Sequence, residues 1–265
     1  MEFITLAQSL ARKAGTLILS RMGEQVLAEE KSSSFDVVTQ VDKDSEQLIR
    51  EGILSEYPDH EILGEEDTFI AQKLLEDVLT AVKKDTYMWI VDPLDGTNNF
   101  VQGIAGFTVS IALSYNGEIL LGVVYDPCSD EMFYAVKNEG AYLNGKQIHV
   151  SDKAGLHTSV IATGFPSQMD ARLAVYNGLG KLIQRCRTIR SLGSAARHLA
   201  YVGAGRLDGF WENGLKTWDV AAGVLIVQEA GGQVSDTSGN PYSLNTLHIV
   251  STNGQVHESL LDCLN

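Results

Sequence analysis

The chain has 265 residues, of which 44% are hydrophobic and 20% charged, with 25 glycines and 5 prolines. This composition is ordinary for a globular protein and argues against a disordered chain. The formal net charge of −14 argues against general binding to nucleic acid or to an anionic membrane, because both need clustered Lys and Arg.

The N-terminal segment MEFITLAQSLARKAGTLILSRM does not resemble a signal peptide or a membrane span, because basic residues interrupt its apolar positions. We therefore expect a cytoplasmic protein. Its length fits one domain over residues 1–265, with an N-terminal α+β half of about 1–150 and a C-terminal α/β half of about 151–265. Three scattered cysteines predict free thiols and no zinc cluster: Cys128, Cys186 and Cys263.

In the first half, apolar residues recur every three or four positions from Phe3 to Met22, which predicts an amphipathic helix. A second helix is expected around residues 48–54, with Asp42 just ahead of it, where an aspartate can act as N-cap. A third helix is expected over residues 69–84. The segment YMWIV is predicted to be a strand that Pro93 ends. Two strand pairs joined by Asn-Gly, at positions 116–117 and 144–145, predict type I′ hairpins.

In the second half, strands and helices alternate. The predicted strands are SVIATGF, LDGFWE and LHIVST, and the predicted helices lie near 170–186, from Gly193-Ser194 onward, and from Thr217 to about Ala230. Gly231-Gly232 would end the last helix. Helices and antiparallel pairs are interleaved without a strict βαβ repeat, so the pattern favours a layered α+β fold over a Rossmann-type sheet.

Carboxylates occur where predicted strands end or helices begin: Glu65 and Glu66 after EILG, Asp92 and Asp95 after WIV, and Asp219 at the start of a helix. The proline and glycine of DPLDG favour a tight turn that lets its two acids converge. Converging acids repel each other unless a cation lies between them, and oxygen ligands select hard cations such as Mg²⁺. Taken singly, Asp219 also fits a helix cap, and Glu65 with Glu66 also fits a solvated loop.

Three segments together resemble the inositol monophosphatase family: GEED at 64–67, WIVDPLDGTNNF at 89–100 and WDVAAGVLIVQEAGG at 218–232. They are similar to the family's G-E-E-S/D, W-x-[IV]-D-P-[IL]-D-G-T-x-N-F and W-D-x-A-[AG]-G elements, in the same order. The resemblance implies a layered αβαβα sandwich and a Mg²⁺-dependent phosphatase with two or three ions per site, Mn²⁺ being a substitute. It also implies a homodimer and inhibition by Li⁺.

The resemblance also implies roles for individual residues. The metal ligands it implies are Glu65, Asp92, the backbone carbonyl of Leu94, Asp95 and Asp219. Thr97 and Asp42 match the family's pair that holds the attacking water, and Glu65 joins them as a catalytic residue. In such a site, metal ions clamp the phosphate and lower the pKa of a bound water, while the threonine hydroxyl orients that water for in-line attack.

The substrate-binding residues implied by the resemblance are Gly96, Thr97, Gly193, Ser194, Ala195, Glu212 and Asp219. The N–H groups of Gly96 and Thr97, at the start of a short helix, would hold phosphate oxygens. Glu212 would bind a sugar-like hydroxyl, although it also fits an ordinary surface acid, and Ser194 also fits a helix cap. Lys31 is similar to a family lysine near a third metal and also fits a solvated lysine.

The expected substrate is a small sugar-like phosphate monoester, with inositol 1-phosphate first. Asn98 stands where nucleoside bisphosphatases and many histidinol phosphatases carry a basic residue, which argues against an extra phosphate or carboxylate contact there. Fructose 1,6-bisphosphate, NADP and histidinol phosphate stay open as alternative substrates. A metal-stabilised regulatory binding protein is an alternative of another class, although a pure scaffold has no use for Thr97 paired with Asp42.

Overall fold

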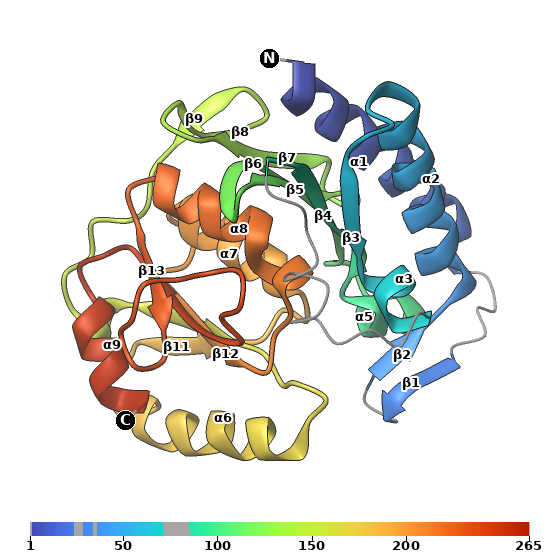
Figure 1. The fold of residues 1–265 in the computed structure, drawn as a ribbon. Coiled ribbons are helices and arrows are strands. Elements are labelled where there is room, and N and C mark those ends of the chain that lie inside the picture. The colour runs from blue at the N-terminus through green and yellow to red at the C-terminus, as the bar shows by residue number, and fades with distance from the viewer. Residues whose placement is uncertain (1, 24–28, 34–35, 71–84, 265) are drawn as a thin grey trace.

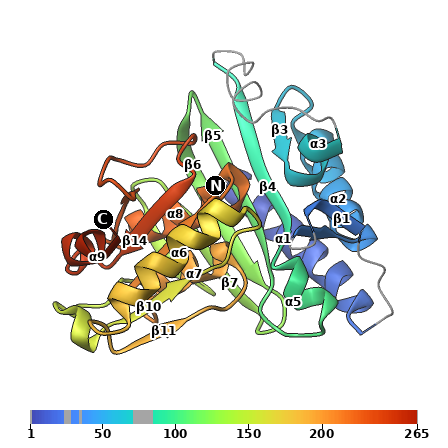
Figure 2. The same ribbon diagram turned by 90° about the horizontal axis from the view of Figure 1, so that it is seen from below.

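The computed structural model describes residues 2–23, 29–33, 36–70 and 85–264 of the chain. Helices and sheets stack in five layers, as Figures 1 and 2 show from two directions. The order is α1 with α2, a seven-stranded sheet, α7 with α8, a five-stranded sheet, and α6 with α9. This is the αβαβα sandwich of α+β class that the sequence predicted.

The seven-stranded sheet has the order β3-β4-β5-β6-β7-β8-β9. Its strands are β3 Glu61–Gly64, β4 Tyr87–Asp95, β5 Thr108–Tyr115, β6 Glu118–Asp126, β7 Glu131–Val136, β8 Gly140–Leu143 and β9 Lys146–Ile148. Only the β3–β4 pair is parallel. Both Asn-Gly turns have positive φ at each residue, 51° and 81° at 116–117 and 48° and 81° at 144–145, which confirms the two hairpins.

The first helical layer consists of α1 Glu2–Arg21 and α2 Gln40–Glu56, packed on the outer face of this sheet. The predicted periodic residues of α1 face inward, and Leu10 and Ile18 are almost fully buried. Burial of a side chain of this size contributes about 1.5–3 kcal/mol. The predicted first helix is therefore confirmed, and its apolar stripe is what attaches it to the sheet.

The expected place of Asp42 ahead of the second helix is wrong. Thr39 has an extended backbone and its hydroxyl accepts from the N–H of Val41, so Thr39 is the N-cap. Asp42 lies in the first turn of α2, and its carboxylate accepts from the N–H of Thr39 at 2.9 Å. The two residues form a capping box, in which the acid reaches back to the cap residue.

The five-stranded sheet has the order β11-β10-β12-β14-β13. Its strands are β10 Val160–Thr163, β11 Thr188–Arg190, β12 Gly209–Asn213, β13 Gln233–Asp236 and β14 His248–Thr252. Helices α7 Ala195–Gly203 and α8 Thr217–Glu229 lie between the sheets, and α6 Met169–Leu182 and α9 His257–Leu264 lie outside. The predicted strands and helices of this half are confirmed, whereas β11, β13 and α9 were not foreseen because each is short.

The remaining elements are short: β1 Glu29–Ser33 and β2 Asp36–Val38 form a hairpin, and α3 Glu65–Ile70, α5 Thr97–Val101 and the 3-10 helix η1 Leu156–Thr158 complete the fold. The helix predicted over 69–84 lies mostly outside the described residues, since 71–84 are not among them. In the described part of the chain, none of the helices has the length and apolar character needed to cross a bilayer. All three cysteines are free.

Pro93 does not end β4, contrary to the sequence prediction. The strand continues to Asp95, but its pairing with β5 shifts between Asp92, opposite Ser110, and Asp95, opposite Thr108. Three steps along β4 thus face two along β5, as in a β-bulge, which accommodates a proline without a ladder N–H. The bulge changes the normal alternation of side chains, and both acids reach the same cavity.

Candidate active site

A polar cavity of about 160 Å³ lies where α3, β4, α5 and α8 meet. Its lining residues are Val37, Glu65, Asp92, Leu94, Asp95, Gly96, Thr97, Asn98, Gly193 and Asp219. Four of these carry a carboxyl group, and none of the described lining residues is Lys, Arg or His. The structure therefore brings all five predicted metal ligands to one small space.

Asp95 and Asp219 are each held by backbone groups at the start of a helix. Asp95 Oδ2 accepts from the Ser194 hydroxyl at 2.6 Å and from the Ala196 N–H at 2.7 Å, at the N-terminus of α7. Asp219, in the first turn of α8, accepts through Oδ2 from the Lys216 N–H at 2.7 Å. Asp219 thus caps the start of α8 and also lines the cavity.

The pKa values of Asp95 and Asp219 are raised in this buried cluster of acids. Burial, followed by the charges of Glu65 and Asp95, raises the pKa of Asp219 well above its ordinary value. Burial also raises the pKa of Asp95 to about 6, and Glu65 adds to this rise against the effect of its hydrogen bonds. A raised carboxyl pKa means that the ionised form is destabilised, and a cation in the cavity would remove that penalty.

Thr97 and Asp42 form the predicted pair at the edge of the cavity. The Thr97 hydroxyl lies 2.8 Å from Asp42 Oδ1 and 3.0 Å from the carbonyl oxygen of Leu94, both of which can accept its proton. Asp42 is fully buried, and burial raises its pKa to about 6 although the hydroxyls of Thr39 and Thr97 oppose the rise. Since the Thr97 hydroxyl donates its hydrogen bond to Asp42 or to the Leu94 carbonyl, the lone pairs of Thr97 Oγ1 are left to accept from another group.

Glu46 is a residue of the site region that the sequence analysis did not single out. Its buried carboxylate accepts from the N–H groups of Glu66 at 2.8 Å and Asp67 at 2.9 Å, and so caps α3, which begins at Glu65. A Cβ on Gly64 would lie 2.5 Å from this carboxyl group, so a glycine is needed for the close approach. Its spacing of four residues from Asp42, on one face of α2, was the available signal.

Some of the predicted substrate-binding residues line the cavity and others lie behind its wall. Gly96, with φ 101°, begins α5 and lines the cavity with Thr97 and Gly193. Ser194 is buried, its hydroxyl donates to Asp95, and it accepts from the N–H of Arg197 as the N-cap of α7. Ser194 therefore supports the cavity wall from behind, and its neighbour Ala195 is buried outside the lining.

Glu212 lies at the end of β12, buried and outside the lining of the cavity. Burial and the charges of Asp219 and Asp95 raise its pKa well above the ordinary value, so it is near the acidic cluster and is not a surface acid. Lys31 belongs to β1, and its side chain lies outside the described residues.

The donor set fits Mg²⁺ by its chemistry. Carboxylates and a backbone carbonyl are hard oxygen ligands, and burial together with the charges of neighbouring acids raises the pKa values of Asp95 and Asp219. Within residues that the structure describes, however, three or more acidic, histidine or cysteine side chains are nowhere close enough to form a complete metal cage. Glu65, Asp92, Asp95 and Asp219 would hold the ion, with the carbonyl of Leu94, once they draw together around it.

The fold and the site define a layered α+β protein with an acid-lined cavity, at whose edge a threonine hydroxyl contacts a buried aspartate. The chain belongs to the inositol monophosphatase family, whose family model matches residues 1–264.

Individual relatives carry two kinds of name. Nus factor SuhB of Escherichia coli K12 is 42% identical over 261 residues, covering 97% of this chain and 94% of that protein. A fructose-1,6-bisphosphatase/inositol-1-monophosphatase of Thermotoga maritima is 36% identical over 265 residues, covering 100% and 96%.

Solved structures agree over the whole chain. The extragenic suppressor protein suhB of Bartonella henselae superposes with a TM-score of 0.90 at 36% identity, covering 100% of this chain and 99% of that one. An IMPase of Thermotoga maritima gives a TM-score of 0.89 at 37% identity, covering 100% and 97%. The family and the fold expected from the motifs are thereby confirmed.

Proposed function

We propose that this protein is a Mg²⁺-dependent phosphatase that hydrolyses small sugar-like phosphate monoesters, with inositol 1-phosphate as its first substrate. The observation that carries the proposal is the 2.8 Å contact between the Thr97 hydroxyl and Asp42 Oδ1 at the wall of an acid-lined cavity. A buried acid that orients a hydroxyl beside a cation site is what hydrolysis requires and what a scaffold does not need.

In the proposed reaction, Thr97 Oγ1 accepts a hydrogen bond from the attacking water, because its own proton is directed to Asp42. The N–H groups of Gly96 and Thr97, at the start of α5, bind phosphate oxygens. Glu65, Asp92, Asp95 and Asp219 would hold the metal together with the carbonyl of Leu94. When bound, Mg²⁺ would neutralise phosphate charge and lower the pKa of a coordinated water.

The position of Glu212 favours a substrate that carries several hydroxyl groups. Its carboxyl group is buried close to Asp219 and Asp95, where a sugar-like hydroxyl would supply the hydrogen-bond donor that such a buried acid requires. The Thermotoga maritima relative named as both a fructose-1,6-bisphosphatase and an inositol-1-monophosphatase makes fructose 1,6-bisphosphate the main competing substrate.

The test is phosphate release from inositol 1-phosphate, fructose 1,6-bisphosphate, NADP and histidinol phosphate, each with Mg²⁺ or with EDTA. Wild-type protein is compared with Asp95→Asn and with Asp59→Asn, which removes an exposed acid remote from the cavity lining. We expect metal-dependent turnover in wild type and Asp59→Asn and a loss of about 100-fold or more in Asp95→Asn. Turnover that EDTA leaves intact would contradict the proposal.

A second candidate is a partner-binding role of the regulatory class considered above. The 42% identity to a protein named Nus factor SuhB favours it. Folded wild-type protein that binds Mg²⁺ but releases phosphate from none of the four esters would support this second function over the first.

A further inference from the structure

The turn Leu192–Ser194 reaches the cavity through one residue. Gly193 lines it, and the Gly193 carbonyl oxygen lies 3.1 Å from where a Cβ on Gly96 would be. The next residue, Ser194, donates its hydroxyl to Asp95 Oδ2. A displacement of this turn would therefore change both the space beside Gly96 and the hydrogen bonding of Asp95.

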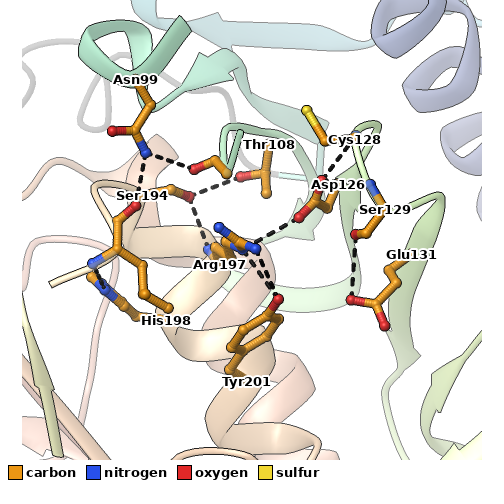
Figure 3. Close-up of polar contacts among 12 residues, drawn as sticks. Asn99, Thr108, Asp126, Cys128, Ser129, Glu131, Ser194, Arg197, His198 and Tyr201 are labelled. Atoms are coloured by element: carbon orange, nitrogen blue, oxygen red, sulfur yellow. Dashed lines mark hydrogen bonds and ion pairs between the residues drawn. The ribbon is translucent and has the colours of Figure 1, made fainter. Parts of the chain in front are cut away.

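The peptide groups of Leu192 are held from two sides, in the region that Figure 3 shows. The Leu192 N–H donates to His198 Nε2 at 2.9 Å, from the first half of α7. The Leu192 carbonyl accepts from Asn99 Nδ2 at 2.7 Å, and the same Asn99 amide donates to the Gly106 carbonyl at 3.0 Å. The turn is thus tied to α7 on one side and to α5 on the other.

His198 is suited to act as a permanent acceptor. Its side chain is fully buried, and its ring lies 4.8 Å from that of Phe210, centre to centre. Burial, with a contribution from the charge of Arg197, lowers its pKa to about 3, so the ring is neutral near pH 7. A neutral imidazole has one acceptor nitrogen, and the bond from Leu192 assigns this role to Nε2 and the proton to Nδ1.

The side chain of the neighbouring residue Arg197 makes its contacts away from Leu192. The Arg197 guanidinium pairs with buried Asp126 at 3.3 Å and donates to the Tyr201 hydroxyl at 3.0 and 3.2 Å. Figure 3 shows these contacts on the side of Arg197 away from His198. Arg197 therefore fixes the start of α7 on β6, and His198 is left to hold Leu192.

We propose that His198 is a positioning residue of the active site, which acts through the Leu192 amide, with Asn99 as its counterpart on the Leu192 carbonyl. Its kinetic consequence rests on the proposed phosphatase function, whereas its effect on the turn does not. Loss of the acceptor leaves a backbone N–H without its partner, and a wall that shifts by a fraction of an ångström misplaces the reacting groups.

The test compares His198→Leu, which removes the acceptor, with His198→Gln, whose amide oxygen can replace Nε2. Asn99→Ala releases the other side of the turn. The matched control is His257→Leu, because His257 is also buried and bonded, to Ser235 at 2.8 Å and Thr252 at 3.0 Å, but is remote from the cavity lining. Two quantities are measured for each variant: kcat/KM on the best ester, and hydrogen exchange of the amides of residues 192–194.

We expect His198→Leu and Asn99→Ala to lower kcat/KM by about 10- to 100-fold and to speed exchange in the turn by about tenfold or more. His198→Gln should stay within about threefold of wild type, and His257→Leu should change neither quantity. Unchanged exchange and kcat/KM in His198→Leu, or an equal kinetic loss in His257→Leu, would overturn the inference. If wild type releases no phosphate at all, the proposed function fails, and exchange in His198→Leu and Asn99→Ala still decides whether the turn is held as proposed.

Discussion

Replacing Asp95 with asparagine is predicted to stabilise the metal-free protein and to destroy its response to metal. Asp95 Oδ2 accepts from both Ser194 and Ala196, and a single amide oxygen in its place can accept from both donors. What the substitution removes is a negative charge that burial and the nearby Glu65 make unfavourable. Function and stability therefore oppose each other at this position.

The size of the effect follows from the pKa of Asp95. It rises from 3.8 to about 6 on folding, and a difference of roughly two units corresponds to about 3 kcal/mol. Because the folded-state pKa is the higher one, this penalty appears as the pH rises from about 4 to about 6 and is complete at neutral pH. Weaker hydrogen bonds to a neutral acceptor offset about 1 kcal/mol, so Asp95→Asn should gain about 2 kcal/mol.

The assay is urea unfolding near neutral pH, in EDTA and in Mg²⁺, for wild type, Asp95→Asn and the exposed-site control Asp59→Asn. In EDTA, Asp95→Asn should be the most stable of the three, by about 2 kcal/mol in the free energy of unfolding. Mg²⁺ should stabilise wild type and Asp59→Asn by mass action and leave Asp95→Asn almost unchanged. Equal or lower stability of Asp95→Asn in EDTA, or an equal response of all three to Mg²⁺, would refute the reasoning.

Three further outcomes are expected. Thr97→Val should lower kcat by about 100-fold or more without weakening the stabilisation by Mg²⁺. Thr97→Ser should retain much of the wild-type rate, because it keeps the hydroxyl group. The control for the same change is Thr16→Val, on the exposed face of α1. Glu46→Gln should cost about 1–3 kcal/mol in urea unfolding, because an amide cannot accept from both N–H groups that cap α3, whereas the exposed Glu51→Gln should cost little. Burial of neutral His198 should appear as a difference between variants: the free energy of unfolding of wild type relative to His198→Leu should fall as the pH drops from 6.5 towards 3, because the unfolded chain can protonate His198 and the folded one cannot.

Local chemistry made much of the fold predictable. The Asn-Gly turns need positive φ, which these two residues adopt readily, so both hairpins were predictable from two letters each. The stripe of α1 was predictable because a helix repeats every 3.6 residues. The failures were also local: at Asp42 a threonine three positions earlier took the capping role, and at Pro93 a bulge absorbed the missing N–H.

The candidate site divides in the same way. Its acids were predictable from three motifs, because each motif combines carboxylates with the turn or helix start that presents them. What only the tertiary structure decided is which atoms meet: Asp42 with Thr97 across 55 positions, Asp95 with Ser194 across 99, and Asn99 with Leu192 across 93.

Those partners lie on different elements, which come into contact only when the helices and sheets pack together. The residues next to a side chain in the sequence do not show which distant residue it will contact. His198 shows this most clearly, since its ring became an acceptor for a backbone amide only when burial in α7 removed it from water and kept it neutral. The sequence alone therefore determined the kinds of chemical group in the site, and the packing of the layers determined their arrangement.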